Sequence, residues 1–320
     1  MRILILGGTG SGGRSLIRHL RGLSPQAHLT VVSRTATSLP GVARVLTGHY
    51  ADLIALPDTR RQLSGLDAVV HLADGLSVLQ YAPHAADEGL AERLTAASEA
   101  LAAAVRDARV PLFVHVSSIK ALCDEADERV LVETSAPRAT TLYGRAKMRL
   151  EQRLSRALDN SDTRLVTVRN PVMYGGAKPG SMSRLLRLAD TPLPLPLAGV
   201  ANRRSLLAID NFGSALAAIV AAGPNGAAGT FHVHDGPALS TTEIVETLRR
   251  ALGRRRRLFG AAALATRLAG RAPGLGPALR RLYGSLELSD ARFRRCFNWT
   301  PVVDSREALS RMAGAAVGRG

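Results

Sequence analysis

Short apolar runs alternate with longer amphipathic segments along the first half of the chain. The runs contain few polar residues, which is typical of strands buried on both faces of a parallel sheet. The segments between them repeat apolar residues at helical spacing; in residues 11–23, Leu16, Ile17 and Leu20 share one face. Alternating strands and helices predict a doubly wound α/β fold with right-handed crossovers. The expected strands are residues 2–6, 28–32, 68–72, 112–116 and 164–168, and the expected helices include residues 11–23 and 90–108.

The pattern changes after Arg169, where prolines and glycines become frequent. Residues 231–234 resemble a late strand, and residues 240–252 resemble a helix that is capped by Ser240 or Thr241. We therefore expect a nucleotide-binding domain in residues 1–170 and a smaller, mostly helical, substrate-binding region in residues 171–320. A segment around residues 204–234 is expected to return to the first sheet.

The charge balance is strongly basic, with 42 lysines and arginines against 26 acidic residues and a formal net charge of +16. A nucleic-acid binder is one explanation of such a charge. However, only Lys120, Lys147 and Lys178 are lysines, the arginines are spread along the chain, and aromatic residues that stack on bases make up 4%. We favour a compositional bias toward arginine, without nucleic-acid binding, and a surface that attracts anionic partners such as diphosphates.

Two cysteines, Cys123 and Cys296, are too few for a disulfide framework or a zinc site. We find no secretion signal and no apolar run of membrane-spanning length, and therefore expect a cytoplasmic protein without stable membrane insertion. Arginines at 254–257 precede Leu258 and Phe259, which leaves open a contact with anionic lipid. An ordinary helix of the substrate region is the favoured interpretation of this stretch.

A glycine-rich turn separates the first strand from the first helix. Gly7, Gly10 and Gly13 form a G-x-x-G-x-x-G pattern, which allows positive φ and lets the backbone approach a pyrophosphate at a helix N-terminus. A tight turn without a ligand is the less favoured alternative. The pattern predicts a Rossmann-type dinucleotide-binding domain. The residues expected to contact the cofactor here are Gly7, Thr9, Gly10, Ser11, Gly12 and Gly13.

The end of the second strand carries Ser33 and Arg34. An acidic residue at this point would bind the ribose hydroxyls of NAD, whereas an arginine suits the 2′-phosphate of NADP. An exposed arginine in an arginine-rich protein is an almost equally good explanation. The sequence therefore leaves NAD or NADP open, with a slight preference for NADP.

Tyr143 and Lys147 form a Y-x-x-x-K pair, which lies on one face of a helix. An ammonium beside a phenol is expected to lower the pKa of the phenol toward the working pH. Ser118, just past a central strand, is expected to bind the same substrate oxygen at the carboxyl edge of the sheet. A chance pair on a surface helix is the alternative. His71 and His115 lie in apolar strands and are expected to be core residues, and we expect no metal.

These residues resemble the extended short-chain dehydrogenase/reductases, specifically the NAD-dependent epimerase/dehydratase group that acts on nucleotide sugars. The resemblance includes the glycine turn, residues 69–73, 116–120, 169–175, 202–206 and 284–286, and the Tyr143/Lys147 pair. It implies that Ser118, Tyr143 and Lys147 are catalytic. It also implies that Ala73, Tyr143 and Lys147 contact the cofactor. The residues expected to bind the nucleotide sugar are Ser118, Asn170 and Arg204, with Arg204 on the diphosphate.

Several residues depart from the pattern of that family. His49 stands where an acidic residue is usual, Leu94 and Ala97 replace an Asn and a Gly, and Asp74 follows Ala73 where a small neutral residue is usual. Leu122 also replaces the aromatic residue or Asn that is common after the catalytic serine. The departures leave open a divergent member with altered or lost activity.

The resemblance implies a UDP-hexose 4-epimerase that works through a 4-keto intermediate. An NADPH-dependent reductase of a UDP-4-keto-6-deoxy sugar in polysaccharide biosynthesis is the first alternative. A catalytically impaired cofactor-binding protein on the same fold is the second. The implied partner is a nucleotide-diphosphate sugar, and homodimers are common in the resembling family.

Overall fold

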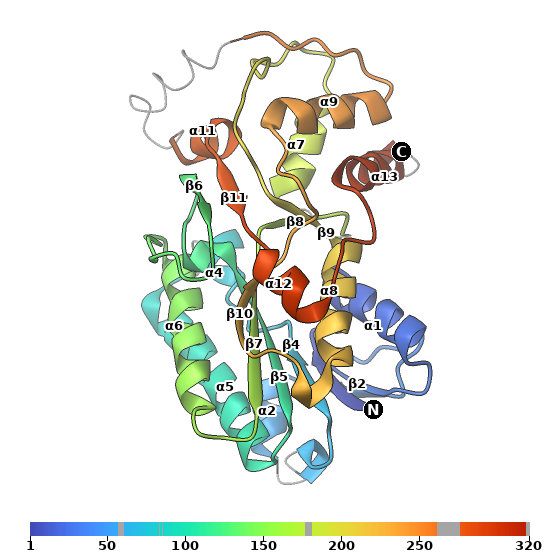
Figure 1. Cartoon of the computed structure of the whole chain (residues 1–320), viewed down its shortest axis with the longest axis vertical. Helices are drawn as coiled ribbons and strands as arrows, with labels where there is room; N and C mark the ends of the chain where they lie inside the picture. Colours follow the sequence, from blue (N-terminus) through green and yellow to red (C-terminus); the bar gives the residue numbers. More distant parts are fainter. Residues whose placement is uncertain (57–60, 83, 85, 177–180, 261–275, 318–320) are drawn as a thin grey trace.

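The structure is a computed structural model of the 320-residue chain and describes all residues except 57–60, 83, 85, 177–180, 261–275 and 318–320. A seven-stranded parallel sheet lies at its centre, in the order β3-β2-β1-β4-β5-β7-β10 (Figure 1). The strand order reverses between β1 and β4, where ligands bind in doubly wound sheets. The Rossmann-type prediction is confirmed. The strands are β1 (Arg2–Leu6), β2 (His28–Ser33), β3 (Arg44–Thr47), β4 (Ala68–His71), β5 (Leu112–Ser118), β7 (Arg164–Asn170) and β10 (Gly229–His232).

Helices cover both faces of this sheet because successive strand residues point to opposite sides. Ile3 and Ile5 of β1 pack into a core with α1 (Ser11–Leu23) and α8 (Ile209–Ala221). Leu4 and Leu6 point the other way, into a core with α2 (Tyr50–Ala55), α5 (Glu88–Asp107) and α6 (Leu142–Ala157). Figure 1 shows the two helical layers on either side of the strands.

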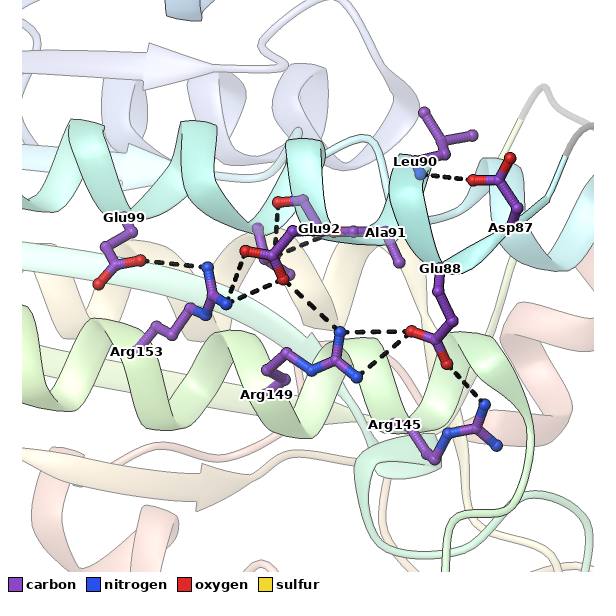
Figure 2. A network of polar contacts seen from close by, with 10 residues as sticks. Asp87, Glu88, Leu90, Ala91, Glu92, Glu99, Arg145, Arg149 and Arg153 are labelled. Carbon is purple, nitrogen blue, oxygen red and sulfur yellow. Dashed lines mark hydrogen bonds and ion pairs between the residues drawn. The ribbon is translucent and has the colours of Figure 1, made fainter.

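The outer faces of α5 and α6 are joined by a ladder of ion pairs (Figure 2). Arg145 contacts Glu88 at 2.9 Å, Arg149 contacts Glu88 at 3.3 Å, and Arg153 contacts Glu92 at 2.7 Å. Single exposed pairs of this kind contribute little stability, whereas a network helps to fix one helix along another. The ladder therefore aligns α6 with α5 over several turns.

A smaller region lies beyond the carboxyl edge of the sheet, in the upper part of Figure 1. Two short parallel sheets enter it, one pairing β8 with β9 and the other pairing β6 with β11. A capping box between Ser240 and Glu243 starts α9, as the sequence predicts for this helix. The elements here are β6 (Asp127–Leu131), β8 (Val172–Tyr174), α7 (Ser181–Ala189), β9 (Leu206–Ala208), α9 (Thr241–Ala251), α11 (Gly276–Tyr283), β11 (Leu286–Leu288) and α13 (Ser305–Val317). Helix α12 (Ala291–Phe297) instead packs beside β10, with Phe293 and Phe297 in the same core as α1 and α8.

Three short helical turns complete the described structure: α4 (Val78–Tyr81), η2 (Ile119–Ala121) and η3 (Gly223–Asn225). Within the described ranges, no helix is long and apolar enough to cross a bilayer. In the basic run at 254–257, Arg254 pairs with Asp190 and Arg256 pairs with Glu246. The residues 261–275 that would continue this run lie outside the described residues.

Candidate active site

The glycine turn after β1 has the geometry that a dinucleotide requires. Gly7 has a φ of +88°, and a Cβ placed on it would lie 2.9 Å from the Cβ of Ala73. Gly10 donates its N–H to the Gly7 carbonyl and is the N-cap of α1, where no side chain caps the helix. An uncapped first turn presents N–H groups and the positive end of the helix dipole to an anion. The turn therefore fits the pyrophosphate of a nicotinamide dinucleotide.

Other residues of the turn serve packing. A Cβ on Gly12 would lie 2.6 Å from Cε1 of Phe212 in α8, and a Cβ on Gly13 would lie 2.4 Å from the Gly8 Cα. These two positions need glycine because α8 and the turn itself approach them closely. The Thr9 carbonyl accepts a hydrogen bond of 3.0 Å from Arg14. Ser11 lies close to Gly176, which brings the segment after β8 toward the turn.

The end of β2 separates a buried serine from an exposed arginine. Ser33 is buried, and its hydroxyl donates to the Thr35 carbonyl at 2.8 Å. Arg34 is exposed, and among the described residues its guanidinium has no hydrogen bond or ion pair. Its side chain is therefore accessible to an anion at the edge where the adenosine half of a dinucleotide lies.

The start of α6 positions Tyr143 and Lys147. The Thr141 hydroxyl accepts from the Gly144 N–H at 3.1 Å, and Asp124 accepts from the Thr140 N–H at 2.6 Å, which fixes the first turn. A Cβ on Gly144 would lie 2.5 Å from the Lys120 carbonyl, so glycine lets α6 approach η2.

The structure brings the three expected catalytic side chains together. Ser118 is the last residue of β5, at the carboxyl edge of the sheet. Tyr143 lies near enough for the Ser118 hydroxyl to act on its phenol, where it acts to lower the pKa of Tyr143. The ammonium of Lys147 lies 5.9 Å from the centre of the Tyr143 ring and donates to the Val116 carbonyl at 3.1 Å. A hydroxyl, a phenol and an ammonium therefore share one edge of the sheet.

A fourth charged group joins this set. Lys147 donates to Oδ2 of Asp74 at 2.6 Å, and both side chains are buried. The pKa of Asp74 lies below its ordinary value although burial acts to raise it, because the Lys147 ammonium favours the carboxylate. The pKa of Lys147 lies above its ordinary value although burial acts to lower it, because Asp74 favours the ammonium. The two groups form a charged pair.

Lys147 acts on Tyr143 in the expected direction, but burial outweighs it. Burial raises the pKa of Tyr143 above its ordinary value, Lys147 acts to lower it, and the Asp74 carboxylate adds to the increase. The sequence marked Asp74 as unusual, but it did not predict that this carboxylate reaches Lys147.

The two further residues expected at the substrate have different surroundings. Asn170 lies opposite Ser118 in the pairing of β5 with β7, and its Oδ1 is buried without a hydrogen bond from the described residues. Arg204 is buried, and its Nη1 donates to the carbonyls of Glu125 at 3.0 Å and Gly284 at 3.1 Å. The Asn170 Oδ1 can therefore accept a hydrogen bond from a ligand, whereas the Arg204 guanidinium already donates to two backbone carbonyls.

Sequence reasoning assigned no role to two charged residues near this edge. Lys120 is half-buried two positions after Ser118, and its pKa is lowered by burial, with further contributions from Arg281 and Arg204. Arg281 of α11 forms an ion pair with Glu125. Because lysine is rare in the chain, the sequence could have indicated a role for Lys120. It could not have indicated Arg281, because the approach of α11 to this edge depends on the tertiary fold.

Three other residues that depart from the family pattern cap a helix or pack against neighbouring residues. His49 is the N-cap of α2, where its Nδ1 accepts from the Ala51 N–H at 3.3 Å. Leu122 is buried in a small core with Ile119 and Leu131. A Cβ on Gly75 would lie 2.8 Å from Cδ2 of Leu94, so Leu94 packs on the loop that carries Asp74.

The strand histidines lie in the core. His71 and His115 are fully buried, and Nε2 of His71 lies 3.0 Å from Oγ of Ser98. Burial lowers the pKa of His71 to about 4 and the pKa of His115 well below 6.5. Both rings are therefore neutral near pH 7. Among the described residues, no group of three or more His, Cys, Asp or Glu side chains is placed to hold a metal ion.

A cavity of about 710 Å³ borders the start of α6. It carries charges of both signs and adjoins Thr141, the N-cap of the helix that bears Tyr143. A polar ligand could occupy it beside the catalytic edge. The cavity is lined by Cys123, Asp124, Glu125, Ala126, Asp127, Glu128, Arg129, Arg138, Thr140, Thr141 and Arg280.

The sheet, the glycine turn and the Ser-Tyr-Lys set define a Rossmann-fold enzyme of the short-chain dehydrogenase/reductase type. Residues 3–233 match the model of the NAD dependent epimerase/dehydratase family, and the chain belongs to that family. The resemblance seen in the sequence is confirmed, as is the expectation of a nicotinamide cofactor. A UDP-glucose 4-epimerase of Vibrio cholerae is 27% identical over 98% of this chain and 94% of its own length.

Solved structures share the fold at lower identity. The UDP-N-acetylglucosamine 4-epimerase of Bacillus cereus superposes with a TM-score of 0.71 at 19% identity, over 100% of both chains. MoeE5, solved in complex with UDP-glucose and NAD, gives a TM-score of 0.72 at 20% identity, again over 100% of both chains. At these identities the likeness is one of fold.

Proposed function

We propose that this chain is an NAD-dependent UDP-hexose 4-epimerase. The observation that carries the proposal is the convergence of Ser118, Tyr143 and Lys147 at the carboxyl edge of the sheet, beside an uncapped glycine turn. The similarity to a UDP-glucose 4-epimerase over nearly the whole chain supports the choice of reaction. The basic net charge of +16 also suits an anionic, diphosphate-linked substrate.

In this mechanism the phenol of Tyr143 exchanges a proton with the sugar. Ser118, at the same edge of the sheet as Tyr143, orients the C4 oxygen. The ionised phenol removes the hydroxyl proton as the C4 hydrogen leaves as hydride, and a 4-keto sugar results. After the sugar turns over in the site, Tyr143 gives the proton back to the oxygen. NAD held at the glycine turn would accept the C4 hydride and return it to the opposite face of the sugar, and it would be unchanged over the whole cycle.

The cofactor and the substrate are proposed to bind along one path across the sheet edge. Gly7, Gly10 and the first turn of α1 hold the pyrophosphate, Ala73 lines the path, and Lys147 lies near the nicotinamide ribose. Asn170, whose Oδ1 is buried and unpaired within the described residues, would accept a hydrogen bond from the sugar nucleotide. Arg204 would reach the diphosphate if one of its backbone partners were exchanged for phosphate.

Incubation with UDP-glucose tests the proposal. Purified protein without added cofactor is expected to form UDP-galactose, detected by NMR or chromatography, because an epimerase regenerates its NAD. Tyr143→Phe removes the proton carrier and is expected to lower the rate about 10²- to 10⁴-fold. Tyr283→Phe removes a phenol that donates to the Pro196 carbonyl at 2.7 Å; it is the matched control and should retain activity. Failure to isomerise any UDP-hexose with NAD present, by folded protein, would refute the epimerase.

Arg34 favours a second candidate function, an NADPH-dependent reductase of a UDP-4-keto-6-deoxy sugar. Its exposed guanidinium could pair with the 2′-phosphate of NADP. In that reaction Tyr143 donates its proton to the keto oxygen, and one NADPH is consumed for each sugar reduced. Stoichiometric NADPH oxidation with a 4-keto sugar, without isomerisation of UDP-hexoses, would support the reductase. Cofactor binding without either activity would support the impaired protein.

A further inference from the structure

Asp74 occupies a position from which it acts on both helical catalytic residues. It follows β4 by three positions, next to Ala73, whose Cβ contacts the glycine turn. Its Oδ1 accepts from the Leu76 N–H at 3.0 Å, which orients the carboxylate. Its Oδ2 accepts from the Lys147 ammonium at 2.6 Å. The carboxylate is therefore fixed from both sides beneath the candidate site.

The pair is nearly sealed from water. The side chains of Lys147 and Asp74 are 7% and 8% exposed. A buried pair of this kind contributes little net stability, because the cost of removing two charges from water offsets most of their attraction. Its presence next to a catalytic phenol therefore calls for an electrostatic role.

Other titratable groups face this pair from each neighbouring element. His71 of β4 and His115 of β5 are both neutral near pH 7, and Glu151 acts on Lys147 from the next turn of α6. Tyr81 of α4 acts on Tyr143 and is itself uncharged near neutral pH. Asp74 is thus the anion in direct contact with the ammonium.

We propose that Asp74 is a positioning residue of the reaction: its carboxylate holds Lys147 in place and cancels the positive charge that would otherwise ionise Tyr143. The proposal rests on the assignment of Tyr143 as the proton carrier. Asp74 therefore moves the ionisation of Tyr143 to higher pH. The protonated phenol suits proton donation to a keto oxygen, and the ionised phenol that removes the hydroxyl proton in the proposed mechanism becomes more abundant as the pH rises.

The charges around Tyr143 support this role of Asp74. Asp74 and burial raise the pKa of Tyr143, and Lys147 and Ser118 lower it. Without Asp74, the ammonium would face the phenol uncompensated. An opposite charge within about 4–6 Å moves the pKa of an acid by about one to three. Removal of the Asp74 charge is therefore expected to increase the phenolate fraction strongly.

Direct titration of the phenol tests the proposal without substrate or cofactor. Ultraviolet absorbance of phenolate is followed with pH in the folded protein, and the same titration of Tyr143→Phe is subtracted to isolate one tyrosine. In the native chain Tyr143 is expected to be less than half ionised at pH 10, because its pKa lies above 10.0. In Asp74→Asn the phenolate fraction at pH 9 is expected to rise about tenfold. Asp52→Asn, at an exposed position of α2, is the matched control.

Asp74→Asn leaves a buried ammonium unpaired and could lose its fold, so a second variant is included. The double variant Asp74→Asn/Lys147→Met removes both charges, so the pH at which its Tyr143 is half-ionised is expected to stay close to that of the native chain. A purely structural pair would leave the phenol titration unchanged in Asp74→Asn. That result, or a native Tyr143 that is half-ionised below pH 8, would overturn the proposal, and so would a double variant that titrates far above the native chain.

The titration also separates this proposal from the proposed function. If the protein proves active, the acidic limb of its pH–rate profile is expected to move to lower pH in Asp74→Asn. If no sugar nucleotide is turned over, the epimerase assignment fails, while the titration still reports whether Asp74 controls the phenol.

Discussion

At the residue scale, a second buried ion pair supports the catalytic edge. Glu151 lies one turn after Lys147 on α6. Its carboxylate accepts three hydrogen bonds of 2.6 to 3.1 Å from the Arg169 guanidinium. It also accepts from the Ser117 hydroxyl at 2.5 Å. This carboxylate therefore fastens α6 to β5 and β7, next to Ser118 and Asn170.

Replacement of Glu151 by glutamine is expected to destabilise the protein. Arg169 and Glu151 are 8% and 7% exposed, so the change leaves a buried guanidinium without its counter-charge. The free energy of unfolding is expected to fall by about 3 kcal/mol. Urea denaturation measures it, with exposed Glu128→Gln as the control. Equal stability of the two variants would show that Arg169 finds other partners.

Spacing alone predicts the candidate site only where its residues are close in sequence; Ser118 was added by its place after a strand. Tyr143 and Lys147 are four positions apart and their shared face follows from helical geometry alone. Asp74 and Lys147 are 73 positions apart, and their contact requires the pairing of β4 with β5 and the packing of α6. The resemblance placed Arg204 on a diphosphate, but the bonds of its guanidinium to two carbonyls depend on how residues 125 and 284 approach it.

At the scale of elements, the sequence predicted the central strands and missed the marginal ones. β1, β4 and β5 are mostly apolar because helices cover them on both sides. β3 lies at the sheet edge, has no fully buried residue, and carries only a weak apolar signal. The short strands that pair in the smaller region have three to five residues, too few for a recognisable period.

The packing of α1 on α8 leads to a prediction about Gly12. The sequence pattern predicts that Gly12 contacts the cofactor. In the structure, Phe212 lies where a side chain at position 12 would be placed. Gly12→Ala is expected to lower the free energy of unfolding by about 1–3 kcal/mol through overpacking. Phe212→Leu should recover part of that loss in the double variant, since it withdraws the Cε1 atom 2.6 Å from the new methyl. Calorimetry of the native chain, the two single variants and the double variant measures the coupling between the two positions. If the losses of unfolding free energy in the single variants simply add in the double variant, the prediction is contradicted.

At the scale of the whole molecule, buried neutral histidines link folding to pH. His71 is fully buried in β4, and burial lowers its pKa to about 4. In the unfolded chain the same imidazole takes up a proton near pH 6.5. Between these two pH values the unfolded state binds more protons than the folded state, so stability decreases as the pH falls through this window.

Replacement of His71 isolates its share of this acid sensitivity. From pH 6.5 to pH 4.5 the native chain is expected to lose about 2 kcal/mol of unfolding free energy through His71 alone, given its pKa of about 4. His71→Gln keeps an amide that can bond Ser98 and has no proton to gain, so its stability should fall less over the same range. Urea midpoints at several pH values give the comparison, with exposed His28→Gln expected to follow the native curve. Parallel curves for the native chain and His71→Gln would mean that the imidazole is already protonated in the folded state, or that its neighbourhood opens before the chain unfolds.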